Sequence, residues 1–353
     1  MHDSAARILD ANLNRAREAL RVLDDYARFA RNDRTLSEAA KRLRHDLVAA
    51  ADLLPAGVLL ASRDTTGDVG TEITAGGEFT RTTTGHVAHV NLKRFQESLR
   101  SLEEFGKLVS APFAERIERL RYAAYSIERA FAQPPAARER FAATRLYVLL
   151  TEEHCPLGWE RTVREAAAGG ATAFQLREKA LCDKDLVNRA RALRDVTREL
   201  GVLFVVNDRA DVAAVADADG VHLGQDDCSL ADARKIVGPN VAIGVSTHAA
   251  EQVQRAVLDG ADYLGIGPTF PSQTKSFDHF PGLGFVSEAA SLTSLPAFVL
   301  GGVNSENVSD VRIAGGTRVA VARAVTHARD PRSAAAAILA GLNALDFPPA
   351  ADR

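Results

Sequence analysis

The chain has 353 residues, of which 46% are hydrophobic and 25% are charged, a composition typical of a globular protein long enough for two domains. Its net charge of -3 and pI near 6.3 argue against nucleic acid or an anionic membrane as the main partner. No apolar signal segment or spanning run is present, so we expect a cytoplasmic protein. Three scattered cysteines without a C-x-x-C spacing predict neither a disulfide framework nor a structural zinc site.

The first region of the chain contains an internal repeat. Residues 12–26 and 91–105 both follow the pattern N-L-x-R-x-x-E-x-L-R-x-L-[DE]-[DE]-[YF] without a gap. Apolar positions recur at alternating three- and four-residue spacing, which predicts an amphipathic helix in each copy. A second helix is expected after each copy, because Arg42-Leu43-Arg44 is answered by Arg119-Leu120-Arg121. The repeat predicts an all-α domain of two related helical hairpins, interrupted between about residues 55 and 89.

The polar positions kept in both copies have two interpretations. The repeated residues are Asn12 and Asn91, Arg15 and Arg94, Glu18 and Glu97, and Arg21 and Arg100. They suit a solvated helix face, on which each Glu-to-Arg pair adds roughly 0.2–0.5 kcal/mol. They also suit a polar site near a pseudo-twofold axis, and the glycine-broken loops at residues 63–68 and 81–86 favour that interpretation because they mix anion-binding and metal-binding groups. No G-x-x-x-x-G-K-[ST] phosphate loop occurs in this region, so a nucleotide site would need another geometry.

A proline pair at residues 134–135 separates this helical region from the rest of the chain. The pattern changes there from helical periodicity to alternating strands and helices. We place a domain boundary near residue 136, which gives domains at 1–136 and 137–353. Residues 347–353 are expected to form a frayed tail.

The second domain alternates short β-rich runs with amphipathic segments. Eight strands are expected, at residues 146–150, 173–176, 203–206, 220–223, 242–245, 263–267, 297–300 and 319–321. Crossover helices are expected at segments such as 185–200, 249–258, 305–313 and 331–342. This order predicts an α/β domain folded as a closed parallel (β/α)8 TIM barrel. An open doubly wound sheet is the alternative, less favoured because no G-x-G-x-x-G follows the first strand.

Carboxylates follow two adjacent predicted strands. Asp208 closes the third strand and Asp227 follows the fourth. Residues just past the strands of a barrel share one face, so we expect the two carboxylates to converge and to hold Mg²⁺ together with substrate phosphates and water. Either aspartate alone would be more typical of a turn or a helix cap. The spacing does not separate Asp227 from its neighbour Asp226.

Cationic side chains follow the second and sixth predicted strands. Arg177, Lys179 and Lys275 could hold a diphosphate and neutralise the charge that builds on it as it leaves. Glu178 lies on the opposite side of the strand pleat from Arg177 and Lys179, so its own role is expected to be structural or indirect.

Hydrogen-bonding side chains complete this group. Ser246 and Thr274 add hydroxyl groups, and Gln175 and Asn207 add amides that can orient a heterocycle or a phosphate oxygen. His222 has two interpretations, a group facing a substrate from inside the barrel or a satisfied core histidine.

A second anion subsite is indicated after the last two strands. Gly301-Gly302 follows the seventh strand and allows close backbone approach, and Ala322-Arg323 follows the eighth. Barrels often bind phosphate with the loops after these two strands. Two phosphate subsites and Mg²⁺ together imply a phosphorylated acceptor that meets a diphosphate donor.

Six motifs then occur in one order over about residues 143–343: Q-L-R-E-K, N-D, G-V-H-L-G-Q-D-D, G-V-S-x-H, G-P-x-F-P-x-x-T-K and G-G-V. In this order they closely resemble the thiamine-phosphate synthase family. The resemblance implies that 4-amino-2-methyl-5-hydroxymethylpyrimidine diphosphate loses pyrophosphate with the help of Mg²⁺. It further implies that the nitrogen of a thiazole phosphate captures the pyrimidine methylene in a dissociative transfer that needs no nucleophilic side chain.

The resemblance also implies roles for individual residues. Those expected to act in catalysis are Arg177, Lys179, Ser246 and Lys275. Those expected to bind the donor are Gln175, Arg177, Lys179, Asn207, Ser246 and Lys275, with Leu176, Glu178 and His222 also in the substrate-binding set. Those expected around the thiazole phosphate are Ser272, Thr274, Gly302, Ala322 and Arg323, and those expected to hold Mg²⁺ are Asp208 and Asp227. The chain departs from the family at Ser272, where threonine is common, and at Arg323, where serine is common.

Alternatives stay open for both domains. A related thiazole tautomerase would need no diphosphate site, so the presence of Lys179, Asp208, Asp227 and Lys275 argues against it. A non-catalytic protein that binds thiamine phosphates would share the pocket. The first domain resembles a helical module fused ahead of some thiamine-phosphate synthases and suggested to phosphorylate the pyrimidine monophosphate, and a dimerisation module is the other interpretation. Expected partners are the small-molecule substrates and a second copy of the chain, without nucleic acid or membrane.

Overall fold

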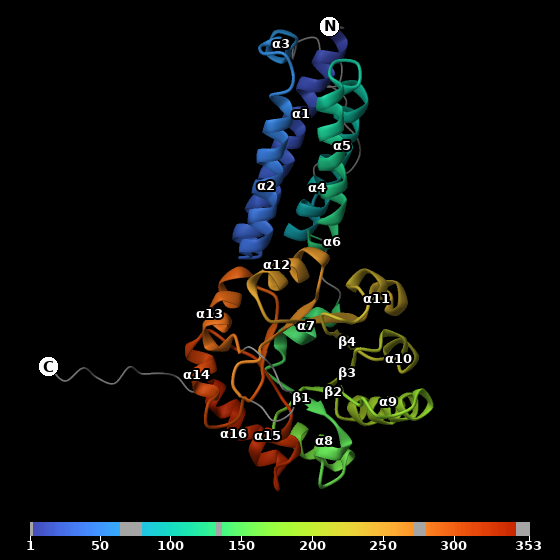
Figure 1. Cartoon of the computed structure of the whole chain (residues 1–353), viewed down its shortest axis with the longest axis vertical. Helices are drawn as coiled ribbons and strands as arrows, with labels where there is room; N and C mark the ends of the chain where they lie inside the picture. Colours follow the sequence, from blue (N-terminus) through green and yellow to red (C-terminus); the bar gives the residue numbers. More distant parts are fainter. Residues whose placement is uncertain (1–2, 64–79, 132–135, 272–279, 344–353) are drawn as a thin grey trace, which may run out of the picture. The chain divides into compact units, whose positions relative to one another are not determined.

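The computed structural model describes residues 3–63, 80–131, 136–271 and 280–343 (Figure 1). The chain separates into two compact units, Met1–Gln133 with Leu258–Gly260, and Pro134–Val257 with Ala261–Arg353. The predicted boundary near residue 136 adjoins residues 132–135, which lie outside the described residues, as does the predicted tail, so both stay predictions. No helix in the described ranges is long and apolar enough to cross a membrane.

The first unit is a bundle of antiparallel helices. Its elements are α1 (Asp3–Asp25), which continues into the π-helix η1 (Tyr26–Ala30), α2 (Arg34–Ala51), α3 (Val58–Ala61), α4 (Thr84–Gly106), α5 (Ala111–Ser126) and α6 (Glu128–Phe131). Helices α1 and α4, which carry the two copies of the repeat, pack against each other, and α2 and α5 complete the two hairpins (Figure 1). The predicted duplicated hairpin is therefore confirmed.

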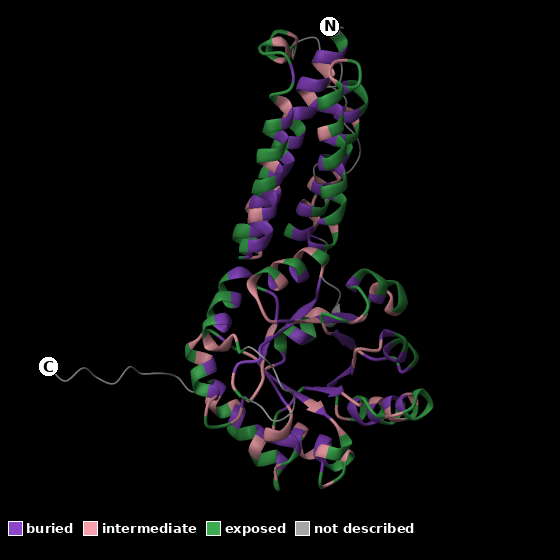
Figure 2. Cartoon of the chain, viewed as in Figure 1, coloured by how far each residue is buried: buried purple, intermediate pink, exposed green. Residues whose placement is uncertain are grey.

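The apolar seams of the two copies form the interior of this bundle. The buried seam residues are Leu13, Ala16, Leu20, Leu23 and Ala27 in one copy and Leu92, Phe95, Leu99, Leu102 and Gly106 in the other. In Figure 2 the buried faces of these helices turn toward one another. A Cβ added at Gly106 would lie 2.6 Å from the Phe113 ring, so this glycine makes room for an aromatic side chain of α5.

The repeated polar positions serve the bundle in different ways. Asn12 and Asn91 each donate a side-chain hydrogen bond to the carbonyl four residues earlier, at 3.0 and 2.9 Å. The repeated arginines and glutamates are exposed: Arg15, Glu18 and Arg21 on α1, and Arg94, Glu97 and Arg100 on α4. This exposure supports the interpretation of a solvated face.

Two acids at equivalent repeat positions are buried and paired within the bundle. Asp24 accepts a hydrogen bond from Ser37 at 2.7 Å and lies 4.0 Å from Arg44. Glu103 accepts a hydrogen bond from Arg121 at 2.6 Å. The arginines that the sequence analysis matched between hairpins thus bind equivalent acids, which ties each second helix to its first.

The second unit is a closed barrel of eight parallel strands. Its strands are β1 (Leu146–Leu150), β2 (Ala173–Leu176), β3 (Leu203–Asn207), β4 (Gly220–Leu223), β5 (Ala242–Thr247), β6 (Tyr263–Ile266), β7 (Ala297–Leu300) and β8 (Val319–Val321). Each strand pairs with the next, and β8 pairs with β1, so the predicted barrel is confirmed and the open sheet is excluded. The surrounding helices are α8 (Trp159–Ala168), α9 (Asp183–Glu199), α10 (Ala210–Val215), α11 (Leu230–Val237), α12 (Ala250–Asp259), α13 (Gly282–Leu292), α14 (Val308–Ile313), α15 (Arg323–Thr326) and α16 (Pro331–Asn343).

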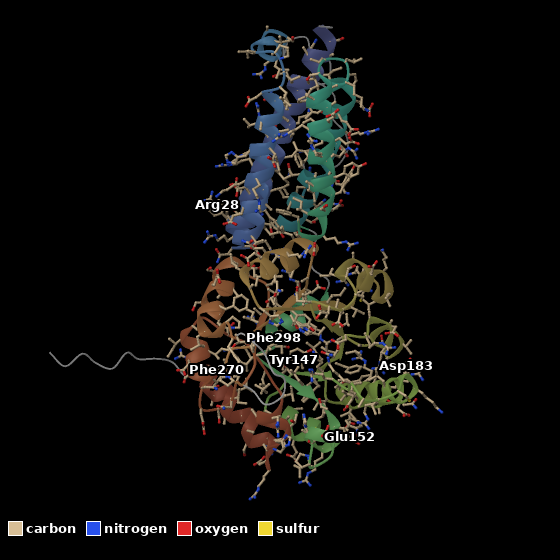
Figure 3. The ribbon with its side chains drawn as sticks, viewed as in Figure 1. Arg28, Tyr147, Glu152, Asp183, Phe270 and Phe298 are labelled. Atoms are coloured by element: carbon tan, nitrogen blue, oxygen red, sulfur yellow. The ribbon has the colours of Figure 1, made fainter. Side chains whose placement is uncertain are left out.

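A helix that the sequence analysis did not predict, α7 (Ala136–Ala143), closes the amino-terminal end of the barrel. Its Phe141 stacks on Tyr263 with ring centroids 4.3 Å apart and touches the first residue of β4, Gly220. Tyr147 and Phe298 complete this aromatic floor, and Figure 3 shows them inside the barrel, where their centroids lie 5.3 Å apart. The floor leaves the carboxyl ends of the strands as the open end.

Candidate active site

A cavity of about 670 Å³ lies at the carboxyl ends of the strands, above the aromatic floor. This is the face on which barrels build their active sites. The predicted site residues that line it are Gln175, Arg177, Lys179, Asn207, Asp208, His222, Asp227, Ser246, Gly302, Ala322 and Arg323. Ser272, Thr274 and Lys275 lie outside the described residues.

Leu176 and Glu178 do not line the cavity, which corrects the expectation that their side chains contact substrate. Side chains alternate across a strand, so the neighbours of Gln175 and Arg177 point to the other face. Leu176 is only 3% exposed and forms part of the core. The Glu178 carboxylate accepts a hydrogen bond from the backbone N–H of Glu152 at 2.6 Å, so it fixes the turn after β1, as its indirect role predicted.

Two carboxylates face each other at the cavity mouth. Asp208 follows β3 in the left-handed region with φ of 63°, and its N–H donates to the carbonyl of His222 at 2.8 Å. Burial and the neighbouring Asp227 carboxylate raise the pKa of Asp208. A non-glycine residue held at positive φ beside a like charge is a strained arrangement of the kind that concentrates at functional sites.

The environment of this pair distinguishes Asp227 from Asp226. One oxygen of Asp227 accepts a hydrogen bond from the N–H of Gly224 at 2.6 Å, which holds the carboxylate toward Asp208. Asp226 is exposed, although it also borders the cavity. The only cation that contacts Asp208 among the described residues is Lys179, whose Nζ lies 3.5 Å from the Asp208 Oδ2.

This donor set fits a hard divalent cation. Carboxylate oxygens are the ligands that Mg²⁺ prefers, and it commonly takes one or two of them and fills its remaining positions with water and phosphate. The described residues contain no group of three or more His, Cys, Asp or Glu side chains placed to bind a metal. The protein would therefore supply two carboxylates here, and the substrate and water would supply the rest.

Deeper in the cavity, Gln175 is hydrogen-bonded to a residue of the aromatic floor. Its Nε2 donates to the hydroxyl of Tyr147 at 2.7 Å, and the Gln175 side chain is buried. This bond fixes the amide plane, so its carbonyl oxygen is directed away from Tyr147 and is available as an acceptor.

His222 and Ser246 form a second polar pair. The His222 Nε2 lies 2.9 Å from the Ser246 Oγ, and burial lowers the pKa of His222 to about 4, so the ring is neutral at pH 7. Neither the His222 Nδ1 nor the Tyr263 hydroxyl has a hydrogen-bond partner among the described residues, although both are buried. Unsatisfied buried polar atoms on a cavity wall indicate a ligand. This geometry favours the substrate-facing interpretation of His222 over a satisfied core histidine.

Glycines shape the opposite wall. Gly301 and Gly302 have φ of 92° and 69°. A Cβ would lie 2.7 Å from the Cα of Pro268 at the first position and 2.6 Å from the carbonyl of Pro271 at the second. Only glycine fits both positions, so the chain after β7 can run directly against the chain after β6 and expose its backbone to the cavity.

Several cavity residues were missed by the sequence analysis. They are Tyr147, Thr151, Gln225, His248, Tyr263, Asn304 and His327. His248 and Gln225 stand inside the quoted motifs and could have been found there. Tyr147 lies in an ordinary apolar strand, and His327 follows a short helix, so neither carried a signal.

Comparison with known proteins agrees with this geometry. A family model described as thiamine monophosphate synthase matches residues 146–325, and one described as the ThiD2 family matches residues 7–130. The thiamine-phosphate synthase of Synechocystis sp. is 39% identical over 97% of this chain and 97% of its own length. That of Gloeobacter violaceus is 42% identical over 96% of both chains.

A solved structure supports the same assignment for the barrel. The thiamine phosphate pyrophosphorylase from Pyrococcus furiosus is 36% identical, with a TM-score of 0.52 over 58% of this chain and 96% of its own. Relatives that extend over both units and a family model for each unit agree with the site built above. The chain therefore belongs to the thiamine-phosphate synthase family of transferases and has an N-terminal unit of the ThiD2 type.

Proposed function

We propose that the barrel joins 4-amino-2-methyl-5-hydroxymethylpyrimidine diphosphate to a thiazole phosphate and releases pyrophosphate. The observation that carries this proposal is the facing pair Asp208 and Asp227, with Lys179 beside it, in a chain that belongs to this family. Two carboxylates held against each other would suit a shared divalent cation, and a diphosphate would bring further oxygen ligands for it.

In this proposal Asp208 and Asp227 would hold Mg²⁺, which when bound would supply positive charge to the leaving diphosphate. Lys179 and Arg177 bind the diphosphate from the side of β2, where both line the cavity. Lys275 is proposed for the same task, although it lies outside the described residues. The chain thus places its positive charge where the bond breaks.

The pyrimidine ring occupies the deep part of the cavity, next to the aromatic floor. The free carbonyl oxygen of Gln175 accepts from an amino group, and Asn207 at the end of β3 offers a second amide. His222 and Tyr263 line the same cavity, and the His222 Nδ1 and the Tyr263 hydroxyl have no hydrogen-bond partner among the described residues. An aminopyrimidine carries a matching set of donors and acceptors on its edge.

The His222 tautomer follows from this geometry. If Nδ1 carried the proton, a buried N–H would be left without an acceptor, which costs more than a bare ring nitrogen. The proton therefore lies on Nε2 and is donated to the Ser246 Oγ, 2.9 Å away. Ser246 is then free to donate its own proton to the donor substrate.

The transfer itself needs no side-chain nucleophile. The bond between the pyrimidine methylene carbon and the diphosphate oxygen breaks, and both electrons leave with pyrophosphate. The aminopyrimidine stabilises the resulting cation, and the lone pair of the thiazole nitrogen forms the new carbon–nitrogen bond. The protein positions the two partners and neutralises the departing group, which are the two contributions its geometry provides.

The acceptor binds on the opposite side of the cavity. Gly302, Ala322 and Arg323 surround its phosphate in this proposal, because the two glycines expose backbone and Arg323 adds a cation. Ser272 and Thr274 are proposed as further contacts from residues outside the described ranges.

The test is direct. The full chain, mixed with both substrates and Mg²⁺, is expected to form thiamine phosphate and one equivalent of pyrophosphate, and excess chelator should abolish both. Pyrophosphate release is followed by a coupled phosphatase assay and the product by its conversion to fluorescent thiochrome. Binding of both substrates without pyrophosphate release would contradict a synthase and favour a non-catalytic binding protein. Isomerisation of the thiazole phosphate alone would favour a tautomerase.

For the N-terminal unit we propose an ATP-dependent phosphorylation of the pyrimidine monophosphate, which is favoured by the ThiD2 match over residues 7–130. Of its polar loops, Arg63 forms two 2.7 Å hydrogen bonds to Asp10, and Thr83 caps α4 by accepting from the His86 N–H. Most of the first loop lies outside the described residues.

The full chain also tests this second proposal. Given pyrimidine monophosphate, ATP and thiazole phosphate, it should form thiamine phosphate without added diphosphate donor. The variant Asp208→Asn should instead accumulate the pyrimidine diphosphate, which separates the two activities. Product from the diphosphate but never from the monophosphate would contradict the kinase, and a dimer that dissociates on deletion of residues 1–136 would favour the dimerisation module.

A further inference from the structure

Four residues from alternate strands lie at one level of the barrel interior. Inward-facing side chains of a barrel stack in layers of four, and every second strand contributes one member. The strands β2, β4 and β6 and the residue after β8 form one such layer, all of which lines the cavity: Gln175, His222, Gly265 and Ala322. Only two members are polar, so a ligand that reaches this depth meets an amide and an imidazole.

The orientation of the His222 ring is fixed by its neighbours. Its Nε2 lies 2.9 Å from the Ser246 Oγ on β5, and its ring centroid lies 5.5 Å from that of Tyr263 on β6. A Cβ added at Gly265 would lie 3.1 Å from the His222 Cε1, so the missing side chain lets the ring lie against β6. A ring turned over would direct a carbon toward Ser246 and lose this hydrogen bond.

The fixed ring leaves one nitrogen with a defined capacity. His222 is only 7% exposed, and its Nδ1 has no hydrogen-bond partner among the described residues. Burial lowers the pKa of His222 to about 4, so the ring is neutral, and with the proton on Nε2 the Nδ1 can only accept. The carbonyl oxygen of Gln175 is also an acceptor, because the Gln175 Nε2 donates to Tyr147. The two polar members of this layer therefore both offer acceptors to a ligand.

We propose that His222 is the specificity-determining residue that separates an amino-bearing pyrimidine from its oxo counterpart, because its Nδ1 accepts a hydrogen bond from the exocyclic amino group. This inference rests on the proposed function and adds which group of the pyrimidine diphosphate the barrel recognises. Ser246 is the positioning residue that holds the ring and its tautomer, and Gly265 gives the ring its place. An amino group has two N–H bonds, for which Gln175 and His222 supply one acceptor each.

An oxo group at the same position of the pyrimidine would be rejected. Its oxygen carries lone pairs where the amino group carries hydrogens, so it would face two acceptors and leave both unpaired. A site built to hydrogen-bond a substrate N–H rejects an analogue that lacks it by as much as about 10⁴–10⁵. The rejection suits the chemistry, since the amino group also stabilises the methylene cation and an oxo analogue would block the barrel without reacting readily.

The experiment measures the oxo diphosphate as a competitive inhibitor of thiamine-phosphate formation. In wild type we expect its inhibition constant to exceed the KM of the amino diphosphate by at least about a hundredfold. His222→Asn places an amide near the position of Nδ1, and this amide can rotate to donate or to accept. In the variant the oxo diphosphate should bind at least about tenfold more tightly than to wild type, a gain that damage to the fold cannot produce.

The tautomer has its own measurement. Nitrogen-15 spectra of histidine-labelled wild type should show an imidazole with the proton on Nε2 and a bare Nδ1, at the signal that Ser246→Ala shifts and His222→Asn removes. Ser246→Ala should also lower the preference for the amino diphosphate, because the proton can then move to Nδ1. His45→Gln is the matched control, since His45 is an exposed histidine of α2 in the other unit, and it should keep the wild-type preference.

Three outcomes would each overturn this role of His222: equal binding of the two diphosphates to wild type, no tighter binding of the oxo diphosphate to His222→Asn, or a proton on Nδ1 in wild type. The spectra of wild type and Ser246→Ala decide the last of these even if His222→Asn does not fold. If wild type forms no thiamine phosphate, the proposed function fails by itself. Calorimetric competition between the two diphosphates in wild type and His222→Asn then still decides which group the ring recognises.

Discussion

Carboxylates at the two ends of the barrel have opposite surroundings. At the amino ends of the strands, Asp219 precedes β4 and Asp262 precedes β6. Asp219 lies 2.8 Å from Arg194, and Asp262 lies 2.6 Å from Arg234. Each also accepts a backbone N–H from the preceding strand of the pair, at 2.8 and 2.9 Å. Each of these acids has an arginine and a backbone N–H as partners, and these contacts tie neighbouring strands together.

At the carboxyl ends, Asp208 and Asp227 face each other instead. Their closest described cation is the exposed Lys179, whose Nζ lies 3.5 Å from the Asp208 Oδ2. The same residue type is therefore satisfied at one end of the fold and left in mutual repulsion at the other. The difference shows which end was shaped for stability and which for a ligand, because neighbouring carboxylates that raise one another's pKa concentrate at functional sites.

The strongest test of the stabilising end is Asp262→Ala. This change leaves the half-buried Arg234 without its carboxylate and should lower the free energy of unfolding by about 3 kcal/mol. Urea denaturation followed by circular dichroism measures the loss, and turnover per folded molecule should stay within twofold. Asp195→Ala, at an exposed acid on α9, is the control and should change little. A stable but inactive Asp262 variant would contradict the division between the two ends.

The strongest test of the ligand end is Asp208→Asn. Asparagine tolerates the positive φ at this position, so the backbone should be kept while the charge is lost. We expect turnover to fall at least about a hundredfold, or roughly 2.7 kcal/mol of transition-state stabilisation. The unfolding midpoint should be equal to or above that of wild type, because a repulsion is removed. Near-normal turnover, measured by pyrophosphate release, would show that the donor site is misplaced.

Lys179→Ala examines the cation beside that carboxylate pair. Its removal takes positive charge from the proposed diphosphate subsite, so turnover should also fall at least about a hundredfold. Lys184→Ala provides the comparison, because Lys184 is an exposed lysine at the start of α9. Equal rates for the two variants in the pyrophosphate assay would remove Lys179 from the catalytic set.

The smallest expected difference in turnover is between variants of the adjacent residues Asp226 and Asp227. Asp227→Asn should reduce turnover at least about tenfold, roughly 1.4 kcal/mol, and raise the Mg²⁺ concentration needed for half-maximal rate. Asp226→Asn should stay within about twofold on both measures, because Asp226 is exposed and Asp227 is turned toward Asp208 by Gly224. The reverse order would assign the metal ligand to Asp226.

The sequence allowed the barrel to be predicted well because its strands are short apolar runs with charged ends. Seven of the eight expected strands begin and end as in the structure or differ by one residue, and β5 extends two residues further, to Thr247. Convergence of Asp208, Asp227 and Lys179 also followed from topology, since barrel strand ends share one face.

Other features could not be read from local sequence. The motif match places Leu176 in the substrate-binding set without regard to its alternation with Gln175 along β2, whereas the pleat already predicts that Glu178 faces away from Arg177. His154 and Arg323 each lie close to His327 although His154 is far from both in the chain, and neither histidine lies in a recognisable motif. Contacts of this kind become visible only when the barrel closes.

The position of Phe141 has a practical consequence for the design of a fragment that contains only the barrel. A fragment that begins at the first strand, near residue 145, would have the complete set of eight strands but would lack the ring that stacks on Tyr263 at 4.3 Å. Its barrel would be open to water at the end opposite the active site. The smallest self-sufficient catalytic fragment should therefore start no later than α7, so the segment that looks like a linker is part of the enzyme's minimal unit.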